Sequence, residues 1–229
     1  MSDRLLKTFK TIGLILALGV SMSACAGFLG LGGDSWKEEV LLHDGSKIIV
    51  KRSQSYGGRH EIGQPSPIKE HTISFTLPGS DKTIMWTSEY SEDVGHANFD
   101  LLAVHVLNGT PYIVATTTGC LSYGKWGRAN PPYVFFKYDG KMWQRIQLSE
   151  FPVEFKTLNV VTYLGSLDVE VMVKQGLVSA ENVKRRNSGL TQPEYRTILR
   201  EALPESALCP QYSGSPKAPI PITPKTSKQ

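Results

Sequence analysis

The sequence has no long hydrophobic run and little net charge. Its early apolar stretch, residues 12–20, is shorter than the roughly 20 residues that a membrane-spanning helix needs. Lysine and arginine (25) nearly balance aspartate and glutamate (21). Without residues 1–24, 22 basic and 20 acidic residues remain of those 25 and 21. A net charge near +2 provides no strong field for nucleic acid, so we predict no nucleic-acid partner.

Short motifs for metal, nucleophile and phosphate sites are also missing. The histidines at 43, 60, 71, 96 and 105 show neither HxH nor HExxH spacing. The sequence contains no G-x-S-x-G elbow, no P-loop and no GxGxxG. We therefore predict no metal ligand, no cofactor and no catalytic residue from motifs, although catalytic groups from distant loops can still converge.

The first 25 residues have the anatomy of a secretory signal. Arg4, Lys7 and Lys10 precede the apolar stretch, and small residues precede a cysteine. Met22-Ser23-Ala24-Cys25 resembles the lipobox of bacterial lipoproteins, with methionine where leucine is commoner. The alternative is a buried N-terminal helix with an incidental cysteine, which the charged start and early end of the stretch disfavour.

The lipoprotein resemblance implies that Cys25 is the lipid attachment site and that residues 1–24 are removed. Acyl chains on Cys25 would hold the protein on a membrane, because each buried CH₂ contributes about 0.8 kcal/mol. Ala26 stands where an aspartate commonly retains Gram-negative lipoproteins in the inner membrane. The resemblance thus implies the cell envelope, at the periplasmic face of the outer membrane. Glycines make residues 25–35 a flexible tether.

Cys120 and Cys209 remain once Cys25 carries lipid. An exported protein meets an oxidising compartment, where such a pair is usually bridged. A bridge over this loop would stabilise the fold by about 4–5 kcal/mol on the chain-entropy model. Two separate buried thiols, or a reactive nucleophile, are the alternatives.

The body carries four hairpin signals before residue 150. Apolar, partly alternating runs flank four turn sequences, which are Asp44-Gly45, Pro78-Gly79-Ser80-Asp81, Asn108-Gly109 and Asp139-Gly140. The hairpins form two modules, residues 36–89 and 99–148, separated by a polar loop over 90–98. Each module resembles a propeller blade, but two blades do not make a propeller. We predict a mainly β fold: an antiparallel β-sandwich or partly open barrel built from two four-stranded meanders.

The region after residue 150 is predicted to be mixed. Residues 158–165 and 167–174 read as strands, and residues 180–186 as a short helix capped by Ser179. A better helix is predicted from Thr191 to Leu203, because its apolar residues recur at helical spacing after a capping box. Residues 210–229 are rich in Pro, Ser and Lys and read as a disordered tail. The predicted single β-rich domain therefore spans residues 36–209.

The most suggestive stretch for recognition is the loop over residues 120–133. Loops on a rigid sheet often carry recognition, and Trp, Tyr and Arg are common interface anchors. The candidate binding residues are Tyr123, Lys125, Trp126, Arg128 and Tyr133. The alternative is that Trp126 folds inward and closes the end of the sheet near Cys120.

These observations favour a lipid-anchored envelope protein that binds or supports another envelope component, protein or glycan, and catalyses nothing. A rival hypothesis is an envelope hydrolase or glycan-active enzyme that uses His60, Glu61 and the 120–133 loop. A third is a small-ligand carrier, which would need a large apolar cavity. The basic run at residues 184–186 could touch anionic lipid, although such runs are usually only solvated.

Overall fold

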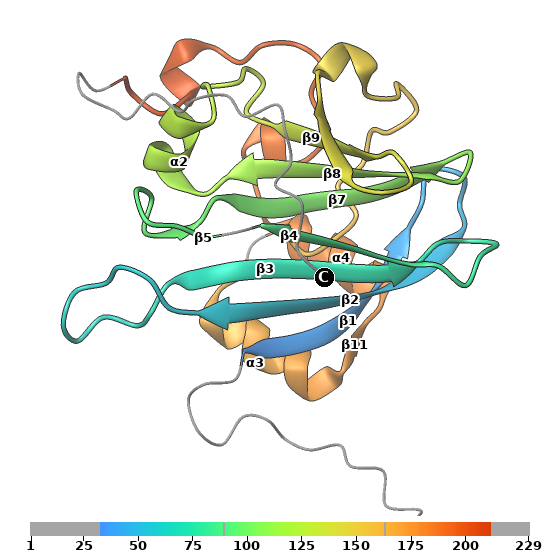
Figure 1. The fold of residues 1–229 in the computed structure, drawn as a ribbon, viewed down its shortest axis with the longest axis horizontal. Helices are drawn as coiled ribbons and strands as arrows, with labels where there is room; N and C mark the ends of the chain where they lie inside the picture. Colours follow the sequence, from blue (N-terminus) through green and yellow to red (C-terminus); the bar gives the residue numbers. More distant parts are fainter. Residues whose placement is uncertain (1–32, 89, 163, 212–229) are drawn as a thin grey trace, which may run out of the picture. The chain divides into compact units, whose positions relative to one another are not determined.

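The computed structural model describes residues 33–211, except 89 and 163 (Figure 1). The predicted signal peptide, Cys25 and most of the predicted tether and tail lie outside these residues. Among the described residues, no helix is long and apolar enough to cross a membrane. The described strands form two large sheets and a two-stranded ribbon, β5 (Tyr90–Ser91) with β6 (His96–Ala97), inside the loop predicted over 90–98.

The first sheet contains the first predicted module. Its strands, in spatial order, are β11 (Leu177–Val178), β1 (Asp34–Leu41), β2 (Lys47–Tyr56), β3 (Ile68–Thr76) and β4 (Thr83–Ser88). β1 to β4 form the predicted antiparallel meander, and β11 adds a short parallel edge beside β1. Burial alternates along β2, where Val50, Arg52 and Gln54 face inward.

The second sheet contains the second predicted module. Its strands, in spatial order, are β10 (Trp143–Ile146), β9 (Val134–Tyr138), β8 (Thr110–Thr117) and β7 (Phe99–Leu107). The turn between β7 and β8 has positive φ at both central residues, 51° at Asn108 and 74° at Gly109. Asparagine and glycine tolerate these angles, which explains why this dipeptide marks the turn.

The two sheets pack face to face as a sandwich rather than a closed barrel, which confirms the first of the two predicted architectures. The core between them is formed by inward residues of both sheets, among them Val50, Ile73, Trp86, Leu101 and Ile113. The outer face of the second sheet is also covered. Phe151, Phe155 and Ile198, from segments without strands, pack against Tyr112 and Phe135 there.

The prediction of a strand over residues 167–174 is wrong, because they lie in the helix α3 (Ser166–Gln175). Apolar residues alternate in this segment and suggested a strand, but Val169 and Met172, three residues apart, are the side chains that become buried. They pack on Trp36 of β1. The predicted short helix is confirmed as α4 (Ala180–Asn187), with the Ser179 hydroxyl accepting a hydrogen bond from the Asn182 amide.

The predicted strand over 158–165 and the predicted helix from Thr191 to Leu203 are also wrong. Residues 158–165 carry no strand in their described part. In the second segment only a 3₁₀ turn forms, η2 (Pro193–Tyr195), and a second turn, η3 (Glu205–Ala207), follows. The Ile198 amide donates to the Lys156 carbonyl, 2.9 Å away, instead of to its own helix. Contacts with the rest of the protein thus replace the hydrogen bonds of the predicted helix.

Candidate functional site

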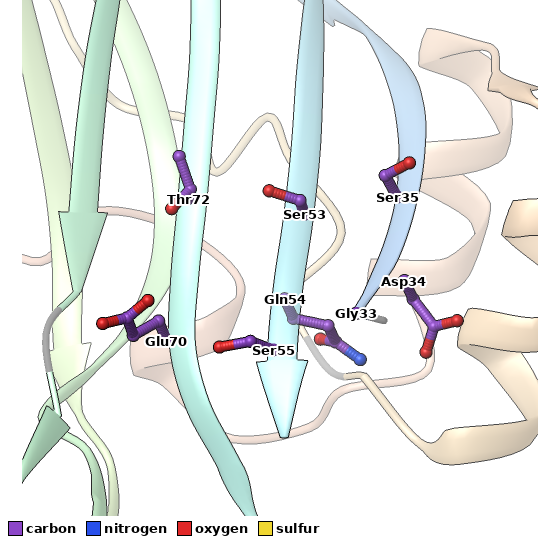
Figure 2. A pocket seen from close by; sticks show the side chains of 8 residues that line it. All are labelled: Gly33, Asp34, Ser35, Ser53, Gln54, Ser55, Glu70 and Thr72. Atoms are coloured by element: carbon purple, nitrogen blue, oxygen red, sulfur yellow. The ribbon is translucent and has the colours of Figure 1, made fainter. Parts of the chain in front are cut away.

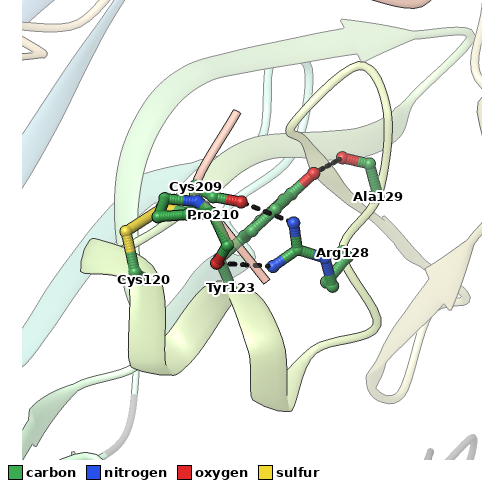
Figure 3. The surroundings of a disulfide bond; sticks show 6 residues. All are labelled: Cys120, Tyr123, Arg128, Ala129, Cys209 and Pro210. Atoms are coloured by element: carbon green, nitrogen blue, oxygen red, sulfur yellow. Dashed lines mark hydrogen bonds between the residues drawn. A yellow bond between two sulfur atoms is a disulfide. The ribbon is translucent and has the colours of Figure 1, made fainter. Parts of the chain in front are cut away.

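The predicted disulfide between Cys120 and Cys209 is present, with the two Cα atoms 5.4 Å apart (Figure 3). Cys120 lies in the short helix α2 (Gly119–Lys125), directly after β8, and Cys209 follows the turn η3. The bridge closes a separation of 89 residues. It therefore fastens the irregular C-terminal segment to the end of the second sheet.

One candidate binding residue, Arg128, holds this C-terminal segment, and a second, Tyr123, contacts Arg128 (Figure 3). The Arg128 guanidinium donates hydrogen bonds to the backbone carbonyls of Cys209 and Pro210. It also lies 4.9 Å from the centre of the Tyr123 ring, a cation–π contact. Tyr123 is buried, and its hydroxyl donates to the Ala129 carbonyl, 2.9 Å away. Burial raises the pKa of Tyr123.

Tyr133 is buried and forms hydrogen bonds with the C-terminal region of the chain. Its hydroxyl lies 2.9 Å from the Glu194 carbonyl oxygen and 3.0 Å from that of Thr197. Burial is the main cause of the raised pKa of Tyr133. Neighbouring Asn130 pairs with both backbone groups of Leu203. These bonds take the place of regular secondary structure in the segment.

Trp126 and Lys125 contact the β5–β7 region instead. The Trp126 ring centre lies 4.6 Å from that of Phe99, and its Nε1 donates to the Asn98 side chain at 3.0 Å. Lys125 forms a 2.6 Å ion pair with Asp93. Trp126 thus folds inward, as in the alternative to recognition. Contacts within the chain already engage all five candidate side chains. Binding of a partner by them stays a prediction.

The residues named for the rival enzyme lie in the exposed loop between β2 and β3. His60 Nδ1 is 2.9 Å from the Gly58 carbonyl oxygen, and Glu61 accepts a long bond of 3.4 Å from Gln64. Both side chains are solvent-exposed. The structure therefore places them in a solvated loop.

A cleft of about 170 Å³ brings other ionisable side chains together, where the first sheet meets β7. Its lining residues are Arg52, Ile68, His71, Asp100, Leu101, Thr162 and Leu164. His71 Nε2 lies 3.3 Å from Asp100 Oδ1, and the two side chains are 6% and 37% exposed. A carboxylate at this distance can orient an imidazole, so the pair has the geometry of an oriented general base.

Arg52, in the wall of this cleft, belongs to a buried ion pair. Arg52 Nη1 lies 3.0 Å from Glu38 Oε1 and 2.6 Å from the Val161 carbonyl oxygen. Glu38 Oε1 also accepts from the Trp36 indole, and Oε2 accepts from the Val161 amide. Buried charges need such partners, because an unpaired charge in the interior is strongly destabilising. The pair ties β1 and β2 to the segment around Val161.

A second cleft, of about 230 Å³, lies near the end of the first sheet where the described chain begins. Figure 2 shows its lining side chains from β1, β2 and β3: Ser35, Ser53, Ser55 and Thr72 carry hydroxyls, and Asp34 and Glu70 carry carboxylates. Both clefts are lined by several polar side chains. Neither is the large apolar cavity that the small-ligand carrier would need.

Sequence reasoning missed the His71–Asp100 pair, although part of the signal was present. His71 alternates with Ile73 and Phe75, which places it on the inward face of β3. Its partner stands 29 positions further on, and local spacing does not show that β3 and β7 meet.

Among residues 33–211, with 89 and 163 left out, no group of three or more His, Cys, Asp or Glu side chains could hold a metal ion. No protein-family model, no curated protein and no solved structure matches the chain.

Proposed function

We propose that the protein is a lipid-anchored protein of the cell envelope whose β-sandwich binds a second envelope protein and does not catalyse a reaction. The lipobox-like sequence at Cys25 supports the anchor. The outer face of the first sheet supports the binding role, since it exposes aliphatic side chains, with Ile49 47% and Met85 60% accessible.

A pair of lysines on this face carries the proposal. Lys37 and Lys51 lie directly opposite each other on β1 and β2, next to Ile49. Like charges in this position destabilise a sheet. Among the described residues, neither lysine has an ion-pair partner. A partner with an apolar patch bordered by carboxylates would complement the lysines and cover the aliphatic side chains.

The test is in-cell crosslinking of the lipidated protein, with captured molecules identified by mass spectrometry. We expect one reproducible protein that is lost in Cys25→Ser and reduced in Lys51→Glu. The matched control is Lys141→Glu, which changes an exposed lysine in the β9–β10 turn. Capture that is unaffected by Lys51→Glu would remove the site, and capture of glycan alone would replace the partner class.

The His71–Asp100 pair supports a second candidate function, an envelope hydrolase with His71 as the base. Hydrolysis of peptidoglycan, ester or phosphoester substrates would then fall sharply in His71→Gln and stay unchanged in His60→Gln. Turnover that is equal in wild type and His71→Gln would exclude this version.

A further inference from the structure

The helix α3 exposes apolar side chains on the face opposite its buried one. Val169 and Met172 are buried, whereas Leu167 is 77% exposed and Val171 43% exposed. Leu167 and Val171 are four residues apart and therefore share one face of the helix. Two exposed aliphatic side chains one turn apart on the helix form a surface that favours an apolar environment.

This surface lies beside the point where the described chain begins. Trp36, three residues after Gly33, packs on Val169 and Met172 of α3. The Gly176 carbonyl at the end of α3 accepts from the Lys37 amide at 2.9 Å. Figure 1 shows α3 next to the start of β1. The aliphatic residues Leu41 and Ile49 on the first sheet lie towards the opposite end of β1.

The chain length between the proposed anchor and the body limits how far this surface can be from a membrane. Gly33 is eight positions after Cys25. Such a segment spans at most about 26–29 Å, whatever its conformation. With acyl chains on Cys25 inserted in a bilayer, α3 is within reach of the lipid headgroups. Because the anchor already supplies membrane residence, weak contacts suffice to orient the body.

The charges around α3 are compatible with an anionic lipid surface. Both acidic side chains of the helix are paired, Asp168 with Arg186 at 2.7 Å and Glu170 with Lys174 at 2.8 Å. The adjoining helix α4 adds exposed Lys184 and Arg185, from the basic run noted in the sequence. Cations near anionic headgroups, together with exposed aliphatic side chains, are typical of interfacial contact.

From this geometry we propose that α3 rests on the bilayer that holds the anchor, with Leu167 and Val171 in its interfacial region. The proposal rests on the lipidation of Cys25 proposed above. The body then has a fixed orientation on the membrane, and the uncovered face of the first sheet remains free for a protein partner.

The test uses full-length lipidated protein in vesicles of phosphatidylethanolamine and phosphatidylglycerol. In Val171→Cys the added thiol is labelled with a polarity-sensitive fluorophore, since Cys120 and Cys209 are bridged. Val153→Cys is the matched control, because it replaces another exposed valine on the segment that covers the second sheet. We expect a blue-shifted emission and several-fold stronger quenching by brominated lipid at position 171 than at position 153. Adding Leu167→Asp should abolish the difference.

Mass spectrometry of the same samples separates the two proposals. Acylated Cys25 with equal quenching at positions 171 and 153 would overturn the membrane-facing surface and leave the anchor intact. Cys25 without acyl chains would overturn both. A blue shift that requires another membrane protein would also overturn the inference, because the surface would then be a protein interface.

Discussion

The two sheets share one core but differ at their outer faces. In the second sheet, β8 buries six consecutive residues, because the segments around Phe151, Phe155 and Ile198 cover the face that points away from the first sheet. In the first sheet, β2 alternates between buried and accessible residues. One sheet is thus supported on both sides, and the other offers a face to its surroundings. The same meander can serve as scaffold or as accessible surface, depending on what the C-terminal part of the chain covers.

Removing the disulfide should have the largest effect on this contrast. Cys120→Ser with Cys209→Ser releases the covering segment and should lower the free energy of unfolding by about 4–5 kcal/mol, measured in urea. Binding of a hydrophobic dye should rise as the outer face of the second sheet becomes exposed. Ser206→Ala, at an exposed position near the bridge, is the control. An unchanged urea midpoint would show that the segment is held without the bridge.

Truncating an aromatic residue of the covered face should come next. Phe151 is buried, with its ring centre 4.5 Å from that of Phe135. Phe151→Ala should lower the free energy of unfolding by about 3–5 kcal/mol, through lost apolar contact and the cavity that remains. Urea unfolding measures the change. A loss below about 1 kcal/mol would mean that the segment does not support the sheet.

Acid should destabilise the covered side through His105. Burial lowers the pKa of His105 to about 4, while its hydrogen bond to the Thr157 carbonyl raises it and nearby His43 lowers it. In the unfolded chain His105 binds a proton near pH 6.5, so above that pH its protonation does not reduce the stability of the fold. As the pH falls from about 6.5 to about 4, the unfolded chain is protonated and the folded protein is not. The free energy of unfolding should therefore fall by about 3 kcal/mol over this range.

The pH dependence can be assigned with one variant. Between pH 6.5 and 4, the free energy of unfolding should depend less steeply on pH in His105→Leu. The difference in slope should correspond to about one bound proton, whatever the stability of the variant at neutral pH. His60→Leu, in an exposed loop, should keep the slope. An unchanged slope in His105→Leu would place the acid sensitivity elsewhere.

Weakening the hydrogen bonds that Arg128 donates to the C-terminal segment should have a smaller, local effect. Arg128→Lys keeps the charge but loses the planar fork that reaches the Cys209 and Pro210 carbonyls. We expect about 1–2 kcal/mol less protection from amide hydrogen exchange in residues 203–211. Arg185→Lys, at an exposed position, is the control. Loss of protection throughout the sandwich would contradict a local effect.

The smallest effect on stability belongs to the open face. Ile49→Ser should change the free energy of unfolding by no more than about 0.5 kcal/mol, because the side chain is already half solvated. Capture of the proposed partner should nevertheless fall. A large loss of stability in urea would mean that this face is covered, and would remove the contrast between the sheets.

The hairpins could be predicted because their determinants are local. The Asn108-Gly109 turn needs only two residues that tolerate positive φ. The alternation of Ile73 and Phe75 similarly marks the inward face of β3. The disulfide was also predicted correctly, from the expectation that the chain is exported and that its cysteines meet an oxidising compartment.

The covering segments could not be predicted, because their structure is decided by distant partners. Residues 191–203 have helical spacing, yet the Tyr133 hydroxyl and the Lys156 carbonyl compete for their backbone groups. The loop around Arg128 has the composition of an interface, and it does hold a peptide segment, the chain's own. Composition indicated that Arg128 would bind something but did not identify the segment that it binds.

The bond between the Val161 amide and Glu38 also leads us to expect a particular order of folding. Glu38 lies on the first strand, and the amide that completes its hydrogen bonding is 123 residues further along the chain. Until that segment arrives, covering the inward face of the first sheet would bury the Glu38 carboxylate with one oxygen unpaired, which is costly. We therefore expect the hairpins of β1 to β4 to form quickly, whereas the inward face of this sheet becomes covered later. The slow step of folding should then be the docking of the Val161 segment on the sheet, because this contact joins residues that are far apart in the sequence.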